Sequence, residues 1–146
     1  MKWRPVSSGS YEKIAYETKE CRGQFLHYIN ILGPIGVTER IPVFEATLAV
    51  NKSENYFCLV DNRAGHENIL TVEDMSFLGD LLLDAGIKRF YAAVVTLDEG
   101  YRGIVKLMNA VAIAKKKIES ETFSSPFYEE AENFLISRTK RFMNPG

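Results

Sequence analysis

The sequence predicts an α/β fold in which a mainly parallel, mixed sheet of about five strands is combined with about four helices. Two short apolar runs, residues 55–61 (NYFCLVD) and 88–97 (KRFYAAVVTL), are typical of central strands that are covered on both faces. Segments with helical spacing follow both runs, which implies parallel pairing with right-handed crossovers. Two aromatic-rich runs that precede them predict one N-terminal antiparallel hairpin.

Length and composition bound the number of domains and the class of partner. A chain of 146 residues is the usual size of one domain, and 46% apolar with 25% charged residues is ordinary for a globular protein. Residues 1–10 are rich in Ser, Pro and Gly and are predicted to be a flexible arm, followed by a single domain over residues 11–146. A net charge of -1 predicts neither a nucleic-acid partner nor an anionic membrane surface.

The compartment is predicted from the absence of targeting signals in the sequence. The start, MKWRPVSSGS, has no apolar run of signal-peptide length, and no run of membrane-spanning length occurs, so we expect a cytoplasmic protein without a membrane span. Cys21 and Cys58 lack a cysteine neighbour at zinc or redox spacing, which fits a reducing compartment. Cys58 lies inside an apolar strand pattern and is expected in the core. No cofactor and no metal are predicted.

The first half of the chain predicts the hairpin and one helix. Residues 11–20 and 24–33 form the two expected hairpin strands around the turn CRG, and GPIG ends the second one. A helix is then expected with Thr38 as its cap, which places Pro42 in the first turn, where its missing amide proton has no helical acceptor. Its apolar positions have helical spacing: Ile41, Phe44, Leu48.

The second half alternates helices and strands. Thr71 is expected to cap a helix that ends at Gly86, and a long helix is expected over residues 98–117. Residues 119–124 predict a short edge strand. Ser125 is expected to cap the last helix, with Pro126 at its first position. The predicted core-facing residues of that helix are Phe127, Ala131, Phe134 and Leu135.

Three segments together resemble a known family. GPIGVTERIPVFEATL after the second strand, FCLVD closing with an acid, and FSSPFYEEAENFL near the end are similar to the STAS domain of anti-sigma-factor antagonists. More narrowly, they resemble its sporulation-antagonist-like relatives, also described as STAS/Sec-fourteen-like. The resemblance spans residues 11–137. It implies a STAS-like fold and a non-enzymatic regulatory or signalling module that binds a protein partner.

The resemblance also bears on phosphorylation. In regulatory members, an acid at the end of the central strand is followed by Asp-Ser-Ser-Gly at the next helix start, and a partner kinase phosphorylates a serine there. Asp61 matches the acid, but this loop reads NRAGHENILTVEDM, and Thr71 carries the only hydroxyl near the helix start. A phosphate on Thr71 would meet free helix amides, whereas Glu73 and Asp74 would repel it. A phosphorylated Thr71 and a plain N-cap are the two alternatives.

The same loop carries groups that are capable of acid-base chemistry. Asp61, Arg63, His66 and Glu67 supply carboxylates, a guanidinium and an imidazole near the end of a central strand. The sequence has no activated nucleophile motif, no glycine-rich phosphate loop and no histidines at ligand spacing, and His27 belongs to the hairpin. An Asp61–Arg63 ion pair that braces the loop is therefore favoured, and no catalytic residue is predicted.

A second loop completes the predicted partner surface. The segment TLDEGYRGIV follows the strand at 88–97, and in a parallel sheet it lies beside the loop after Asp61. The two loops together suit an acidic peptide or a small anion. The predicted partner-binding residues are Asp61, Arg63, His66, Glu67, Thr71, Asp98, Tyr101 and Arg102.

The partner predicted by the resemblance is a protein, such as a kinase-like anti-sigma factor. Aromatic residues in the hairpin leave a homodimer open as a second possibility. A small-ligand or lipid carrier is the alternative, because the helices carry bulky apolar residues, and a small enzyme that uses His66 is a third. The aromatic residues of the hairpin are Tyr11, Tyr16, Phe25 and Tyr28, and the bulky helical residues are Phe44, Phe77 and Met108.

Overall fold

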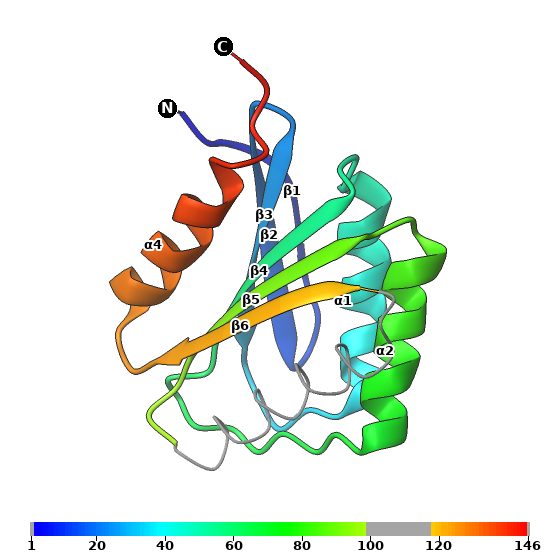
Figure 1. Cartoon of the computed structure of the whole chain (residues 1–146). Helices are drawn as coiled ribbons and strands as arrows, with labels where there is room; N and C mark the ends of the chain where they lie inside the picture. The colour runs from blue at the N-terminus through cyan, green and yellow to red at the C-terminus, as the bar shows by residue number, and fades with distance from the viewer. Residues whose placement is uncertain (1, 99–117, 146) are drawn as a thin grey trace.

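The computed structural model describes residues 2–98 and 118–145, and its centre is a six-stranded sheet with the order β1-β2-β3-β4-β5-β6. The first three strands pair antiparallel, and β3 to β6 pair in parallel, which confirms the predicted mixed α/β topology (Figure 1). The strands are β1 (Arg4–Ser10), β2 (Ile14–Cys21), β3 (Gln24–Ile31), β4 (Asn55–Asp61), β5 (Arg89–Val95) and β6 (Glu119–Ser125).

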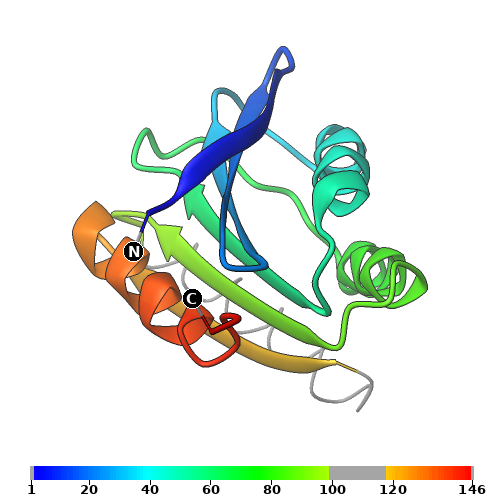
Figure 2. The same cartoon turned by 90° about the horizontal axis from the view of Figure 1, so that it is seen from above.

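Helices lie on both faces of this sheet. Figure 2 shows α1 (Val37–Val50) and α2 (Val72–Asp84) on one side and α4 (Tyr128–Thr139) on the other, packed against β4, β5 and β6. The helix predicted over residues 98–117 falls outside the described residues, apart from Asp98. Among the helices that are described, none is long and apolar enough to cross a membrane.

The segment predicted as a flexible arm forms an edge strand instead. Residues 4–10 pair along β2 with a register shift between Pro5 and Ser7, so the prediction of a loose arm is wrong there. Gly9 lies directly against the ring of Tyr16, where a Cβ atom would come within 2.6 Å of a ring carbon. The hydroxyls of Ser7 and Tyr16 are 3.2 Å apart. Pairing with β2 thus outweighs the low strand propensity of a Ser/Gly segment.

Two apolar clusters fill the two sides of the sheet. Tyr56, Cys58 and Val60 of β4 face α1 and α2, whereas Phe57 and Leu59 face α4. This alternation is what a strand that is buried on both faces requires. β4 and β5 are buried along almost their whole lengths, as their apolar sequences predict.

The first helix begins earlier than predicted. Its N-cap is Gly36, whose amide donates to the Glu39 carboxylate at 2.8 Å, and Pro42 lies inside the helix rather than in its first turn. A tertiary contact explains this start, because Ile35 forms a β-bridge with Asn68 in the loop after β4. This bridge keeps the chain extended up to Gly36. The prediction of Thr38 as the cap is therefore wrong.

The last helix begins later than predicted. Ser125 remains in β6 beside Val95, and its hydroxyl accepts from the amide of Phe127 and donates to Glu130, each at 3.0 Å. Phe127 is the N-cap and is 61% exposed, so its predicted place in the core is wrong. Ala131 and Leu135 are fully buried, as predicted.

A buried polar network joins β2, β3 and α1 around His27. Thr18 Oγ1 lies 2.7 Å from Nδ1, and Asn51 Oδ1 lies 2.8 Å from Nε2. The Asn51 amide nitrogen donates to two backbone carbonyls, so its oxygen accepts and Nε2 carries the proton of a neutral ring. The ring of Tyr56 stacks on this imidazole with 4.6 Å between centroids. Burial lowers the pKa of His27 from 6.5 to about 4.

Candidate functional site

The candidate site lies at the edge where the parallel strands end. Figure 1 shows the connections after β3, β4 and β6 gathered at this lower edge, which is the usual ligand side of an open α/β sheet. Two backbone hydrogen bonds tie neighbouring loops together there, from Asn62 to Val95 at 2.9 Å and from Thr96 to Ser125 at 3.0 Å. The structure therefore brings Asp61 and Asp98 to one edge, as predicted for parallel strands.

Asp61 and Arg63 form the predicted ion pair. The Arg63 guanidinium donates to both carboxylate oxygens, at 3.0 and 2.8 Å, and the Arg63 amide donates to Asp61 Oδ1 at 3.2 Å. The guanidinium also lies 5.1 Å from the ring centroid of Tyr128, the first residue of α4. The hydrogen bond with Asp61 raises the pKa of Arg63. Arg63 thus holds the loop after β4 against α4.

Asn62 organises this loop, although the sequence analysis did not select it. Its buried side chain donates to the carbonyl of His66 and accepts from the amide of His66, each at 3.1 Å. Gly65 has a φ of 74°, which is a conformation that glycine adopts without strain. An Asn followed three positions later by Gly, directly after a strand, was the available sequence signal.

His66 and Glu67 are positioned mainly by their backbones. His66 is partly buried, and the carbonyl of Glu67 accepts from the amide of Ile35 at 3.0 Å. In the described part of the chain, the hydrogen bonds of His66 are made by its backbone to Asn62, and Asp61 is paired with Arg63.

Possible metal ligands and cysteine thiols are dispersed among the described residues. Across residues 2–98 and 118–145, no three His, Cys, Asp or Glu side chains gather closely enough to hold a metal ion. Cys21 and Cys58 are both free and buried. Burial raises the pKa of the Cys58 thiol to about 12, which keeps it protonated and confirms its predicted place in the core.

Thr71 forms a reciprocal cap at the start of α2. Its Oγ1 accepts from the amide of Asp74, and the Asp74 carboxylate accepts from the amide of Thr71, each at 3.0 Å. The predicted N-cap is therefore confirmed, and phosphorylation of Thr71 stays a prediction.

We expect Thr71→Ala to lower the free energy of unfolding by about 1 kcal/mol, because the helix loses a capping acceptor. Thr71→Ser keeps the hydroxyl and should lose much less. Urea unfolding followed by circular dichroism measures both variants. Equal losses for the two variants would contradict a contribution from the hydroxyl.

The second predicted loop is only partly described. Asp98 is exposed, and its amide donates to Thr96 Oγ1 at 3.1 Å. Tyr101 and Arg102 lie outside the described residues, so their contribution to the same patch stays a prediction.

Exposed apolar side chains concentrate at this edge of the sheet. Of the eight large apolar side chains that are exposed among the described residues, only Val6 in β1 and Phe77 in α2 lie elsewhere. The other six belong to the loops at this edge or to the first residue of α2, and we call them the edge surface: Tyr11, Leu32, Ile69, Val72, Leu97 and Phe127. Isolated apolar residues in loops carry no periodic pattern, so they are not among the residues predicted from the sequence.

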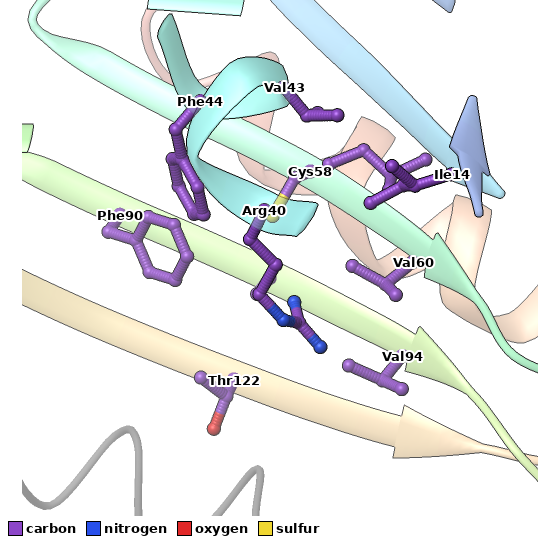
Figure 3. Close-up of a pocket in the computed structure, with 11 residues that line it drawn as sticks. Ile14, Arg40, Val43, Phe44, Cys58, Val60, Phe90, Val94 and Thr122 are labelled. Carbon is purple, nitrogen blue, oxygen red and sulfur yellow. The ribbon is translucent and has the colours of Figure 1, made fainter. Parts of the chain in front are cut away.

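A small apolar cavity lies between α1 and the sheet (Figure 3). Arg40, which is 7% exposed, points toward Val94 within this lining, and its guanidinium donates to Asn68 Oδ1. The cavity has about 30 Å³, which is room for about one water molecule.

A larger, open pocket of about 380 Å³ lies on the α4 side of the sheet. β2, β3 and the end of β4 line it together with Tyr128, and it includes both Asp61 and Arg63. Among the described helices, α4 packs on this face mainly against β4, β5 and β6, and it reaches β3 through the hydrogen bond between Tyr28 and Glu132 (Figure 2).

Comparison with known proteins identifies the fold and not the activity. No family model matches the sequence, and no curated protein matches it at a significant level. Among solved structures, the chain is similar to an uncharacterised DUF3478-family protein with a SpoIIAA-like fold from Shewanella loihica PV-4. The two share 19% identity with a TM-score of 0.53, over 89% of this chain and 99% of the other. This likeness confirms the predicted STAS-like fold.

Proposed function

We propose that this chain is a non-enzymatic regulatory module that binds a protein partner through the loops at the carboxyl edge of its parallel strands. The observation that carries the proposal is the edge surface, whose six exposed large apolar side chains belong to the same edge of the sheet as Arg63 and Asp98. Protein interfaces combine an apolar centre with a polar rim, and aromatic and Arg side chains supply most of their binding energy. This edge has that composition.

The loops that carry this surface are held in place before any partner binds. Ile35 and Asn68 bridge the loops after β3 and β4, and Ile69 donates back to Ile35 at 2.9 Å. Arg63 joins the second of these loops to Tyr128. A preformed surface loses less conformational entropy on association, which favours binding.

The partner is proposed by class only. The STAS-like fold supports a regulatory protein such as a kinase-like anti-sigma factor, and a second copy of this chain is the other candidate. His66, Glu67 and Asp98 belong to the polar rim in this proposal, and Thr71 is the proposed position for a regulatory phosphate. We keep the cytoplasm as the proposed compartment.

The two alternative functions differ in the support that they have. A carrier needs a cavity on the order of 300 Å³ or more, whereas the apolar cavity beneath α1 has about 30 Å³. Of the two pockets described above, the open pocket on the α4 side has the required size, at about 380 Å³. An enzyme that uses His66 would need partner groups for the imidazole, and Asp61 is instead paired with Arg63.

Substitutions in the edge surface test the proposal. We expect Ile69→Asp and Phe127→Asp each to weaken binding by about tenfold, because a charge would be buried in the apolar centre of the interface. The tagged chain is used to isolate its partner from the host, and native mass spectrometry identifies that partner. Calorimetry with the purified partner then gives the affinities, and sedimentation measures self-association if the partner is a second copy.

Val6→Asp is the matched control, because Val6 is also exposed and apolar but lies in β1, away from the edge. Its affinity should equal that of the original chain, while Arg63→Glu should weaken binding without a large change in melting temperature. Full affinity in both edge variants would exclude this surface as the interface.

A further inference from the structure

The open pocket on the α4 side has the size and lining of a ligand site. Its volume of about 380 Å³ falls within the range of about 300–1,000 Å³ that is typical of small-molecule sites. Ala15 and Leu59 supply small and apolar surface, and Tyr28 of β3 and Tyr128 of α4 supply aromatic surface. Two of its lining residues, Asp61 and Arg63, also belong to the predicted protein interface, whereas the residues of β2 and β3 that line it do not.

Three carboxylates lie near these two tyrosines. Glu17 and Asp61 line the pocket, and Glu132 accepts a hydrogen bond of 2.8 Å from the Tyr28 hydroxyl. Burial, and then the nearby carboxylates, raise the pKa values of both Tyr28 and Tyr128, so both phenols stay neutral. Among the described residues, Lys19 and Arg63 are the cations that lie over these two tyrosine rings.

Each of these cations rests on one of the two tyrosine rings. Lys19 Nζ lies 5.0 Å from the Tyr28 centroid, and Arg63 Cζ lies 5.1 Å from the Tyr128 centroid. At both places, a cation therefore lies over a tyrosine ring and beside a carboxylate: Lys19 beside Glu17, and Arg63 beside Asp61. These two internal contacts indicate that the rings of Tyr28 and Tyr128 can each bind a cationic group.

The two cations are held with different strength. Arg63 makes close, two-pronged hydrogen bonds to Asp61, whereas the contact of Lys19 Nζ with the Glu17 carboxylate is 3.7 Å, which is too long for a good hydrogen bond. The Glu17 side chain is about half exposed, so this pair contributes little and is easily exchanged. Lys19 is the cation that a ligand can displace.

We propose that this pocket binds a primary alkylammonium group, which replaces the Lys19 ammonium beside the Tyr28 ring and the Glu17 carboxylate. Such a group can belong to a free diamine or to a lysine side chain of another protein. Glu17, Lys19 and Tyr28 lie outside the edge surface, so this inference stands independently of the proposed protein interface.

Titrations followed by two-dimensional NMR test this inference with three probes. Cadaverine represents a free diamine, Nα-acetyl-lysine amide represents a lysine side chain, and Nα-acetyl-norleucine amide is the uncharged comparison. We expect at least one of the two amines to bind with shifts at Tyr28 and Tyr128, and the norleucine compound not to bind. The amine that binds more tightly identifies the source of the ammonium group.

Two variants, one in the pocket lining and one beside it, separate this site from general charge attraction. Glu17→Gln should weaken amine binding by about fivefold, and Lys19→Met should strengthen it by a similar factor, because an internal competitor is removed. Glu12→Gln, at an exposed position in the turn between β1 and β2, removes the same charge outside the pocket and should leave binding unchanged.

Three results would overturn the proposal. They are equal weakening by Glu12→Gln and Glu17→Gln, binding of the uncharged probe, and binding of neither amine. Ile69→Asp, in the loop before α2, should not change amine binding, which keeps this result separate from the protein-interface test.

Discussion

Tyr56→Ala is expected to lower the free energy of unfolding by about 3–5 kcal/mol. Tyr56 is fully buried in β4, and its ring stacks on His27 and on Phe44 and Phe90, at centroid distances of 4.6, 5.9 and 5.7 Å. Truncation would leave a cavity between β3, β5 and α1. The closely packed side chains around it cannot move far enough to fill the cavity. A domain is usually stable by about 5–15 kcal/mol, so the loss is a large share of the total.

Urea unfolding at neutral pH measures this loss, and Tyr56→Phe separates the ring from the hydroxyl. The Tyr56 hydroxyl lies 2.8 Å from Thr47 Oγ1, which also donates to the carbonyl of Val43 at 2.7 Å. Thr47 therefore keeps a partner in Tyr56→Phe, and we expect that variant to lose only about 1 kcal/mol. Tyr11→Ala removes an exposed tyrosine and should have a small effect. A loss in Tyr56→Ala no greater than that in Tyr11→Ala would contradict the packing described here.

The second large effect is a loss of stability in acid that originates at His27. The folded pKa of His27 is about 4, while an unfolded histidine titrates near 6.5, so between these values the unfolded chain binds a proton that the folded chain does not. Stability from this group is therefore fully present above pH 6.5 and is lost as the pH falls toward 4. The difference corresponds to about 3 kcal/mol.

Urea unfolding at a series of pH values between neutral pH and pH 4 measures this dependence. His27→Gln cannot titrate, so we expect its stability to decline less over that interval than the stability of the original chain, although it starts lower. His66→Gln controls for the loss of one imidazole from an exposed loop. Parallel curves for the original chain and His27→Gln would show that His27 does not cause the acid sensitivity.

Carboxylates with lowered pKa values affect the free energy of unfolding at lower pH than His27 does. Hydrogen bonds from Arg4 and Arg138 lower the pKa values of Glu20 and Glu121, respectively. Their contributions are present above the ordinary carboxyl pKa and are lost only as the pH falls through the lowered values. Both proteins in the comparison share these groups, so the difference between their curves isolates His27.

The sequence predicted the pairing of Asp61 with Arg63 but not the other contacts of this loop. Asp61 and Arg63 lie two positions apart after a buried strand, so their pairing follows from local geometry. Asn62 was missed because its role depends on the path of the loop back to His66. The contact of Arg63 with Tyr128 joins residues that are distant in the sequence, and no local pattern encodes it.

The sequence by itself determined the elements whose cause is local or periodic. Full burial requires an apolar run, which is why β4 and β5 could be recognised, and the cap at Thr71 depends only on residues within one helical turn. The tertiary structure decided the features that depend on distant partners. Residues 4–10 became a strand because β2 presents an edge to pair with, and α1 begins at Val37 because Ile35 is bridged to Asn68. The edge surface likewise exists only because parallel strands bring separate loops to one edge of the sheet.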